Sequence, residues 1–322
     1  MEEKREKEYR LINMEDVEIR EVEWLWYPYI TYGKLTIVLG VPGEGKTTFI
    51  LQLAALLTKG ETLPCDKEGE REPINVIYQN AEDGLEDTIK PRLVQAGADC
   101  NRVLVIDESQ DELSMTDERL VRAIKETGAK MVILDPIQAY LGSDIDMHRA
   151  NEIRPILKRL GGIANQFQCA FILVGHMNKA NGSKSTYRGL GSIDFQATAR
   201  SVLVVGRIKD NPEIRVIAHD KSSLAPEGKS MAFEMNRESG FKWMGHYDIT
   251  VEELLSGCNR ESKQRKAEML LTDMLADGCV TQAEIIKQAK AMDISKRVLD
   301  SAKKKLAVKS KKSGEKWYWS LD

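Results

Sequence analysis

The segment Gly40-Val-Pro-Gly-Glu-Gly-Lys-Thr47 decides how this chain folds. It fits the pattern G-x-x-x-x-G-K-[ST] at every fixed position, and this pattern forms a loop whose backbone N–H groups surround the phosphates of a nucleotide. Glycines let phosphate oxygens come within about 3 Å of the backbone, because they carry no side chain. The apolar run at 34–40 and the helix-like run at 46–58 supply the strand and the helix that the pattern requires on either side. We predict that ATP contacts Gly40, Pro42, Gly43, Glu44, Gly45, Lys46, Thr47 and Thr48.

Two residues of this loop have roles that follow from their side chains. Lys46 reaches the β and γ phosphates, and the Thr47 hydroxyl ligates Mg²⁺. Such a loop also needs a carboxylate near the metal, at the end of a neighbouring buried strand. Asp135 directly follows the apolar run at 131–134. An aspartate that merely caps a strand has the same pattern, but beside a phosphate loop we predict a Mg²⁺ site formed by Thr47 and Asp135.

Hydrolysis needs a group that orients or deprotonates water, and a carboxylate at the tip of another strand suits this role. The segment at 76–83 ends a predicted strand with two adjacent acids. We predict that Glu82 is the catalytic carboxylate and that Asp83 neighbours it or caps the next helix; the alternative is that both acids only favour a helix N-terminus. His176 leaves a third apolar strand. We predict that His176 senses the γ phosphate, and the alternative is a purely structural histidine.

The segment at 180–192 is small, polar, basic and rich in glycine. This composition predicts a loop whose cations contact DNA phosphates, and the alternative is an ordinary solvated loop. The predicted DNA contacts are Lys184 and Arg188 in this segment and Lys179, directly before it.

Arg207 and Lys221 each leave a strand late in the same domain. In ring-shaped ATPases a cation from one subunit stabilises the charge on the phosphoryl group that its neighbour transfers. Both residues are therefore candidate catalytic cations between subunits, although a surface salt bridge would look the same in the sequence.

Strand-like and helix-like runs alternate through most of the chain. Strands are predicted at 34–40, 75–79, 103–106, 131–134, 171–174, 202–205 and 214–218, with helices at 46–58, 85–96, 118–127 and 151–167. This alternation predicts an α/β fold with a doubly wound, mostly parallel sheet. The last strands have short connections and are expected to form antiparallel hairpins.

The C-terminal part of the chain has its own character. Residues 262–322 carry a net charge of +6, whereas residues 1–261 carry −9. Three amphipathic helices and a hairpin over about 60 residues outline a winged helix, which would place helix cations in a DNA groove and wing cations on the backbone. A basic surface that meets an acidic protein partner is the alternative. The predicted DNA contacts here are Lys296, Arg297, Lys303, Lys304, Lys311 and Lys312, and Trp317, Tyr318 and Trp319 are expected to pack the hairpin on the helices.

These features divide the chain into four parts. We expect a polar N-terminal lead at 1–20, an ATPase domain at 21–255, a linker at 256–263 and the winged-helix-like domain at 264–322.

The order of the motifs resembles a known family. The aromatic stretch at 25–29, the phosphate loop, the segments at 78–83, 134–136 and 175–179, and the segment at 187–192 are together similar to RecA-like ATPases related to plasmid and phage replicative hexameric helicases. The resemblance covers about residues 20 to 245. It implies a RecA-like fold, the roles given above for Lys46, Thr47, Glu82, Asp135 and His176, and an inter-subunit cation at Arg207 or, by comparison with recombinases, at Lys221.

Composition bounds the remaining hypotheses. An apolar fraction of 42% and a charged fraction of 30% exclude a disordered chain or a disulfide scaffold. No apolar run approaches the roughly 20 residues that span a membrane, the charged first ten residues do not resemble a secretory signal, and five widely spaced cysteines indicate a reducing compartment. We therefore expect a cytoplasmic, homo-oligomeric ATPase that binds DNA, with a hexamer favoured. The predicted function is Mg²⁺-dependent ATP hydrolysis coupled to movement on DNA, as a helicase-type motor in mobile-element replication; the alternatives are a recombinase-like or loader ATPase that does not unwind DNA, or an ATP-gated DNA-binding regulator.

Overall fold

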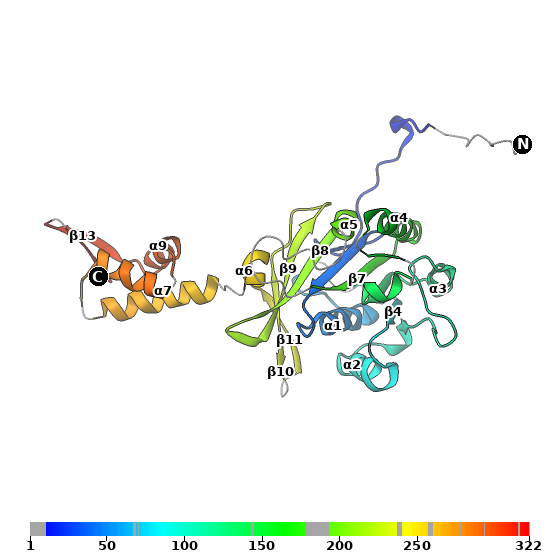
Figure 1. Cartoon of the computed structure of the whole chain (residues 1–322), viewed down its shortest axis with the longest axis horizontal. Coiled ribbons are helices and arrows are strands. Elements are labelled where there is room, and N and C mark those ends of the chain that lie inside the picture. The colour runs from blue at the N-terminus through cyan, green and yellow to red at the C-terminus, as the bar shows by residue number, and fades with distance from the viewer. Residues whose placement is uncertain are drawn as a thin grey trace, which may run out of the picture.

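The computed structural model describes residues 11–66, 69, 71–142, 145–147, 149–177, 193–236, 240–256, 260–276, 278–292, 294–314 and 316–321. It shows an α/β domain built on one large sheet, followed by a small helical module (Figure 1).

The large sheet has nine strands in the order β11-β10-β9-β8-β3-β7-β6-β4-β5. Six of them are parallel: β3 (Leu35–Gly40), β4 (Val76–Asn80), β5 (Val103–Leu104), β6 (Met131–Asp135), β7 (Ala170–His176) and β8 (Ser201–Ile208). The last three, β9 (Asn211–Ser222), β10 (Met231–Asn236) and β11 (Gly240–His246), continue the sheet in antiparallel fashion. The predicted fold class and the antiparallel hairpins at its end are confirmed.

Helices cover both faces of this sheet (Figure 1). One apolar core lies under α1 (Lys46–Lys59) and α2 (Lys90–Gln95), and the other lies under α3 (Glu118–Thr127) and α4 (Ala150–Phe167). The predicted helix at 85–96 is a π-helical turn, η2 (Leu85–Ile89), that continues into α2. The domain also contains β1 (Trp24–Trp26), β2 (Ile30–Thr31), α5 (Ile193–Thr198), α6 (Val251–Ser256) and the 3₁₀ turns η3 (Cys100–Arg102) and η4 (Ile137–Tyr140), and a further 3₁₀ turn, η1 (Met14–Asp16), lies in the N-terminal segment.

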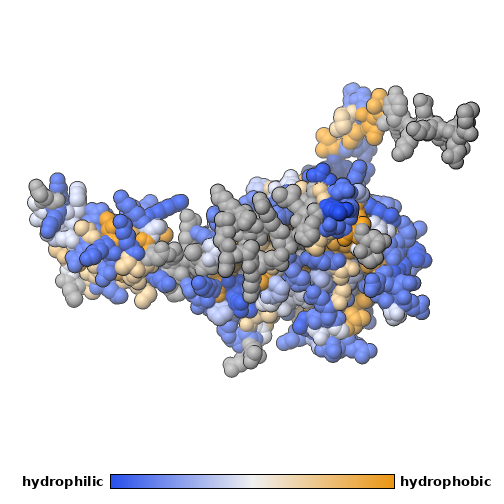
Figure 2. Space-filling model, in the orientation of Figure 1, coloured by the Kyte–Doolittle hydropathy of each residue, from blue (hydrophilic) through white to orange (hydrophobic). Residues whose placement is uncertain are grey.

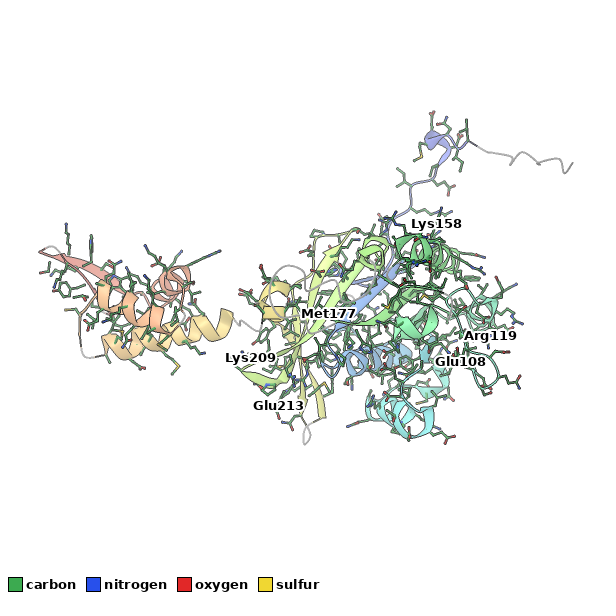
Figure 3. All side chains as sticks on the ribbon, viewed as in Figure 1. Glu108, Arg119, Lys158, Met177, Lys209 and Glu213 are labelled. Atoms are coloured by element: carbon green, nitrogen blue, oxygen red, sulfur yellow. The ribbon has the colours of Figure 1, made fainter. Side chains whose placement is uncertain are left out.

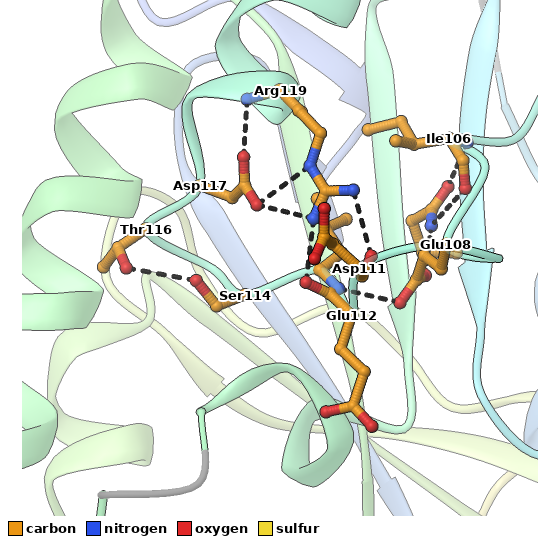
Figure 4. Close-up of polar contacts among 10 residues, drawn as sticks. Ile106, Glu108, Asp111, Glu112, Ser114, Thr116, Asp117 and Arg119 are labelled. Atoms are coloured by element: carbon orange, nitrogen blue, oxygen red, sulfur yellow. Dashed lines mark hydrogen bonds and ion pairs between the residues drawn. The ribbon is translucent and has the colours of Figure 1, made fainter.

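Strand β5 is shorter than predicted, because a side chain takes over its pairing. The Gln79 amide donates to Ile106 O at 3.2 Å and accepts from Ile106 N at 2.6 Å. Beyond this point the loop before α3 is tied down by polar contacts (Figure 4). Arg119 donates to Asp117 and to the carbonyls of Asp111 and Glu112.

The C-terminal module has the element order predicted for it. It contains α7 (Arg260–Leu275), β12 (Val280–Thr281), α8 (Gln282–Ala291), α9 (Lys296–Lys305), β13 (Lys309–Ser313) and β14 (Lys316–Ser320), with β14 between β12 and β13. Thr281 and Ser295 cap α8 and α9. Helix α7 begins at Arg260, inside the segment predicted as a linker.

The expectation that Trp317 packs the hairpin on the helices is wrong. Trp319 is buried in the module's own apolar core, but Trp317 is 47% exposed. Both side chains lie on the same face of β14, but Trp319 pairs with Val280 of β12 and Ser310 of β13, whereas Trp317 lies two residues nearer the turn and pairs with Lys312 of β13 beyond the end of β12.

The N-terminal segment is less polar than its charge suggested. Its described part, 11–23, leads away from the α/β domain and exposes apolar side chains (Figure 2). The exposed fractions are 85% for Leu11, 70% for Ile12, 77% for Met14 and 99% for Ile19. Across the described residues, we find no helix with the length and apolar character that crossing a bilayer demands.

A buried histidine makes the stability of the α/β domain depend on pH. His219 is 5% exposed, accepts a hydrogen bond from Gly228 N at 2.8 Å and has Nε2 3.0 Å from Ser201 Oγ. Burial lowers the pKa of His219 to about 4. The unfolded chain therefore binds this proton more readily than the folded domain, and stability that is complete above about pH 6.5 is lost as the pH falls toward 4.

We expect the free energy of unfolding to drop by about 3 kcal/mol more in the wild-type protein than in His219→Gln between pH 7 and 4. Urea titrations at both pH values measure this difference. His246→Gln, a change at an exposed histidine of the same domain, serves as the control. Equal pH dependence of His219→Gln and the wild-type protein would contradict the assignment.

Candidate functional site

The phosphate loop connects β3 to α1, and its glycines are required by the fold as well as by a ligand. Gly45 precedes α1 with φ 93°, and a Cβ there would lie 3.0 Å from Met235 Sδ. A Cβ on Gly40 would lie 2.4 Å from the carbonyl oxygen of Val205 in β8. Gly40 therefore allows β3 and β8 to pack closely. This requirement for glycine at position 40 cannot be read from the phosphate-loop pattern.

Lys46 is held inside this loop. Its side chain is 4% exposed, and Nζ donates to Gly40 O at 2.9 Å and Val41 O at 3.2 Å. Burial lowers the pKa of Lys46, against the opposing charges of Asp135, Glu82 and Glu44. Among the described residues, the hydrogen-bond acceptors of this ammonium are these two loop carbonyls, and phosphate oxygens would be stronger acceptors.

Thr47 and Asp135 meet as predicted. The Thr47 hydroxyl donates to Asp135 Oδ2 at 2.8 Å, and Asp135 is 2% exposed at the end of β6. Burial raises the pKa of Asp135, while hydrogen bonds from Thr47 and Tyr78 and the charge of Lys46 oppose that rise.

Thr47 and Asp135 suit a Mg²⁺ ion that is also bound by water and phosphate, rather than a metal ion bound by protein side chains alone. Within the described ranges, no three or more His, Cys, Asp or Glu side chains gather into a metal cluster. Mg²⁺ commonly takes one or two protein oxygens and completes its shell with water and substrate phosphate. Thr47 and Asp135 would supply those oxygens, and the ion would neutralise charge on the phosphates.

Glu82 and His176 come together from different strands. His176 Nε2 lies 3.1 Å from Glu82 Oε1. The position of His176 is fixed by Met177, whose backbone N–H donates to Gly40 O at 3.1 Å and whose buried side chain lies near the centre of the domain (Figure 3). The strand that carries His176 is therefore bonded directly to the first residue of the phosphate loop.

Asp83 does not cap the following helix. It forms an ion pair with Arg92 of α2 at 2.9 Å, and Gly84 occupies the N-cap of the π-helical turn without a side-chain bond. The capping alternative for Asp83 is therefore wrong, and Glu82 alone of the two acids contacts His176.

The loop, Glu82 and His176 border one cleft of about 840 Å³. Its other walls come from α2, with Arg92, and from the β10–β11 hairpin, with Met235 and Phe241. The aromatic residues near the N-terminus do not border it: Trp26 is fully buried and donates to Pro64 O at 3.1 Å. The hairpin lies about 190 residues after the loop, so local sequence gave no signal for it.

Arg207 and Lys221 are both engaged within their own chain. Arg207 lies 3.3 Å from Glu44 of the phosphate loop. Lys221 donates to the carbonyls of Gln196, Ala197 and Ala199 at 2.7, 3.1 and 2.9 Å, at the end of α5. Within a single chain, Arg207 therefore forms a salt bridge, which is the alternative that the sequence left open. Lys221 instead caps the C-terminal end of α5.

The predicted DNA contacts are placed only in part. Lys179, Lys184 and Arg188 lie outside the described residues. Five of the predicted contacts on α9 and β13 are exposed, namely Lys296, Arg297, Lys304, Lys311 and Lys312. Lys303 differs from them, because its ammonium lies 4.1 Å from the Trp319 ring centroid and donates to Ser310. We therefore assign Lys303 to the packing of the hairpin.

The fold and the cleft together define a P-loop ATPase with a RecA-like fold. The family described as an AAA domain matches residues 3–182, more than half of the chain. The chain belongs to this AAA domain family.

Two curated relatives are similar to part of the chain. The DNA repair protein RadA of Bacillus subtilis (strain 168) is 28% identical over 153 residues, which are 47% of this chain and 29% of the relative. RadA of Halalkalibacterium halodurans is 27% identical over 177 residues, 54% of this chain and 34% of the relative. The chain thus spans about a third of the length of these curated relatives. Among solved structures, the ATPase domain of G40P superposes with a TM-score of 0.52 and 15% identity, covering 67% of this chain and 86% of that one, and shows the fold.

Proposed function

We propose that this ATPase uses Mg²⁺-dependent hydrolysis to move on DNA, as a helicase-type motor that serves the replication of mobile elements. One observation carries the proposal: Lys46, Thr47, Glu82 and His176 border a single cleft, and the buried Asp135 bonds to Thr47 there.

Each of these groups has a role that its surroundings support. The N-terminus of α1 and Lys46 hold the phosphates, because free N–H groups and a positive charge favour anions there. Thr47 and Asp135 hold the metal. Glu82, 57% exposed at its side chain, takes a proton from the attacking water or orients it. His176 links Glu82 to β7, whose chain continues into the segment predicted to contact DNA.

The C-terminal module supplies a second, basic surface for DNA. Its order of helices and strands supports a winged helix, with α9 in the groove and the β13–β14 turn on the backbone. Among the exposed cations of α9 and β13, we propose this role for Lys296, Arg297, Lys304, Lys311 and Lys312. We assign duplex DNA to this module and single-stranded DNA to the ATPase domain.

The proposal includes a homo-oligomer, with a hexamer favoured. The apolar side chains exposed at 11–19 support it, because a segment of this kind gains by packing on another surface. In the oligomer Arg207 or Lys221 would exchange its contact within the chain for the neighbour's phosphates. This exchange is part of the proposal.

A mass measurement combined with a hydrolysis assay tests the function. We expect a hexamer in the presence of an ATP analogue and single-stranded DNA, together with ATP hydrolysis that depends on Mg²⁺ and increases with DNA. A matched variant, Lys311→Glu combined with Lys312→Glu, should weaken binding to duplex DNA by about 10-fold or more at moderate salt without changing hydrolysis in the absence of DNA. A rate of ATP hydrolysis that does not change when single-stranded DNA is added would contradict the proposal of a DNA motor.

The names of the relatives favour one other function. Two relatives are named as DNA repair proteins, which supports an ATPase that acts in recombination without unwinding DNA. Strand displacement on a forked substrate separates the two: a helicase releases the strand, and a recombination or loader ATPase does not.

A further inference from the structure

A chain of hydrogen bonds, buried between Tyr78 and Asp135, joins the metal-side acid to the backbone of the catalytic carboxylate. Asp135 Oδ2, which accepts from Thr47, also accepts from the Tyr78 hydroxyl at 3.2 Å. The Tyr78 oxygen accepts from Asn80 Nδ2 at 3.0 Å. Asn80 Oδ1 in turn accepts from the backbone N–H groups of Glu82 at 2.9 Å and Asp83 at 2.6 Å. We refer to Asp135, Tyr78 and Asn80 as the relay.

Every donor in the relay has one acceptor, and the directions are mutually consistent. Asp135 only accepts when it is ionised, so the Tyr78 proton points toward it and the Tyr78 oxygen is free to accept from Asn80. With the amide of Asn80 reversed, its NH₂ group would face two backbone N–H donors. The orientation of Asn80 is therefore set by the chain of bonds itself.

The relay is rigid, because its members are buried or lie on paired strands. Tyr78 is fully buried, and Asn80 is paired with Asp135 across β4 and β6. The same two strands are bonded once more beyond the ladder, where Ala81 N donates to Asp135 O at 3.2 Å. Buried polar networks that are fully satisfied fix a single local geometry.

The geometry points to Tyr78 and Asn80 as positioning residues that tie the place of Glu82 to the orientation of Asp135. The inference rests on the proposed role of Glu82 as the catalytic carboxylate. If the Thr47 hydroxyl were a ligand of Mg²⁺, Asp135 would lose one hydrogen-bond donor and keep the other, Tyr78. The Asp135 carboxylate would therefore stay aligned, and any displacement of Asp135 would be passed to the backbone of Glu82 through the side chains of Tyr78 and Asn80. His176 holds the other end of Glu82, at its carboxylate.

Amide hydrogen exchange in the nucleotide-free, full-length protein tests the relay without relying on activity. In Tyr78→Phe, Asn80 loses its acceptor and can turn, so we expect the Glu82 and Asp83 amides to exchange roughly fivefold faster. Asn80→Ala should have the same effect, whereas Asn80→Asp keeps an acceptor for both amides and should leave their exchange unchanged. Tyr29→Phe is the matched control, because Tyr29 is 2% exposed and donates one hydrogen bond, to Lys229 O at 2.7 Å, outside the cleft.

Steady-state hydrolysis completes the test. Tyr78→Phe and Asn80→Ala should lower kcat by about 10- to 100-fold and leave the affinity for a fluorescent ATP analogue unchanged. Unchanged exchange at 82–83 in Tyr78→Phe overturns the relay, and so does equally fast exchange in Tyr29→Phe, which would report general loosening. Faster exchange with an unchanged kcat overturns the positioning role and points to a failure of the Glu82 assignment, while the hydrogen-bond chain itself stands.

Discussion

Glu82→Gln should lower kcat for ATP hydrolysis by a factor on the order of 10²–10⁴ while the protein still binds nucleotide. The amide keeps the size of the side chain, and it can still accept a hydrogen bond from His176 Nε2, which lies 3.1 Å from Glu82 Oε1. It removes the negative charge that would take a proton from water. The phosphate-holding groups, Lys46 and the start of α1, are unchanged. Single-turnover hydrolysis, measured together with the affinity for a fluorescent ATP analogue, separates loss of chemistry from loss of binding.

Asp83→Asn is the matched control for this experiment. Asp83 is the adjacent carboxylate, yet it pairs with Arg92 instead of His176. We expect it to retain hydrolysis within about threefold of wild type, since an exposed ion pair contributes little. If Asp83→Asn lost hydrolysis and Glu82→Gln kept it, the two acids would have to exchange roles.

The sequence was most informative where one local pattern determines both structure and chemistry. The phosphate loop implies its strand and its helix, and β3 and α1 lie where it requires them. Strand-then-acid patterns predicted Asp135 and Glu82 because the carboxyl ends of parallel strands meet at one edge of a sheet. The contacts of Asp135 with Thr47 and of Glu82 with His176 follow from that geometry.

The residues that the sequence did not reveal depend on contacts between distant segments. Tyr78 and Asn80 look like ordinary members of a buried strand, and their role depends on Asp135, more than 50 residues later. The Met235 wall of the cleft comes from the antiparallel end of the sheet. In the sequence, Lys303 cannot be told apart from the other lysines of its basic helix, because its contact with the Trp319 ring depends on the position of the hairpin. Charge and periodicity specify which face is polar, but they do not specify which partner a polar group meets.

Lys46→Met should reduce hydrolysis and nucleotide affinity together, by a factor on the order of 10³ in kcat/KM for ATP. The ammonium is the one cation among the described residues that donates to the loop carbonyls, Gly40 O and Val41 O. Methionine keeps the approximate volume of the side chain and removes the charge. We expect both the affinity for ATP and the rate of hydrolysis to fall, because a positive charge that holds the phosphates stabilises the bound substrate as well as the transition state. Lys59→Met, an exposed change in the last turn of the same helix, should leave both quantities unchanged.

For the stability of the folded protein, we expect Lys46→Met to have no unfavourable effect, in contrast to its effect on activity. Lys46 is 4% exposed, and burial lowers its pKa. A buried charge with incomplete compensation is often replaced by an apolar group of similar volume without loss of stability, or with a gain. We therefore expect the nucleotide-free Lys46→Met variant to unfold at the same urea concentration as the wild-type protein or a higher one. A variant that lost ATP binding and also unfolded more readily would show that Lys46 stabilises the loop, and the charge would then be part of the fold instead of a group held in place for phosphate.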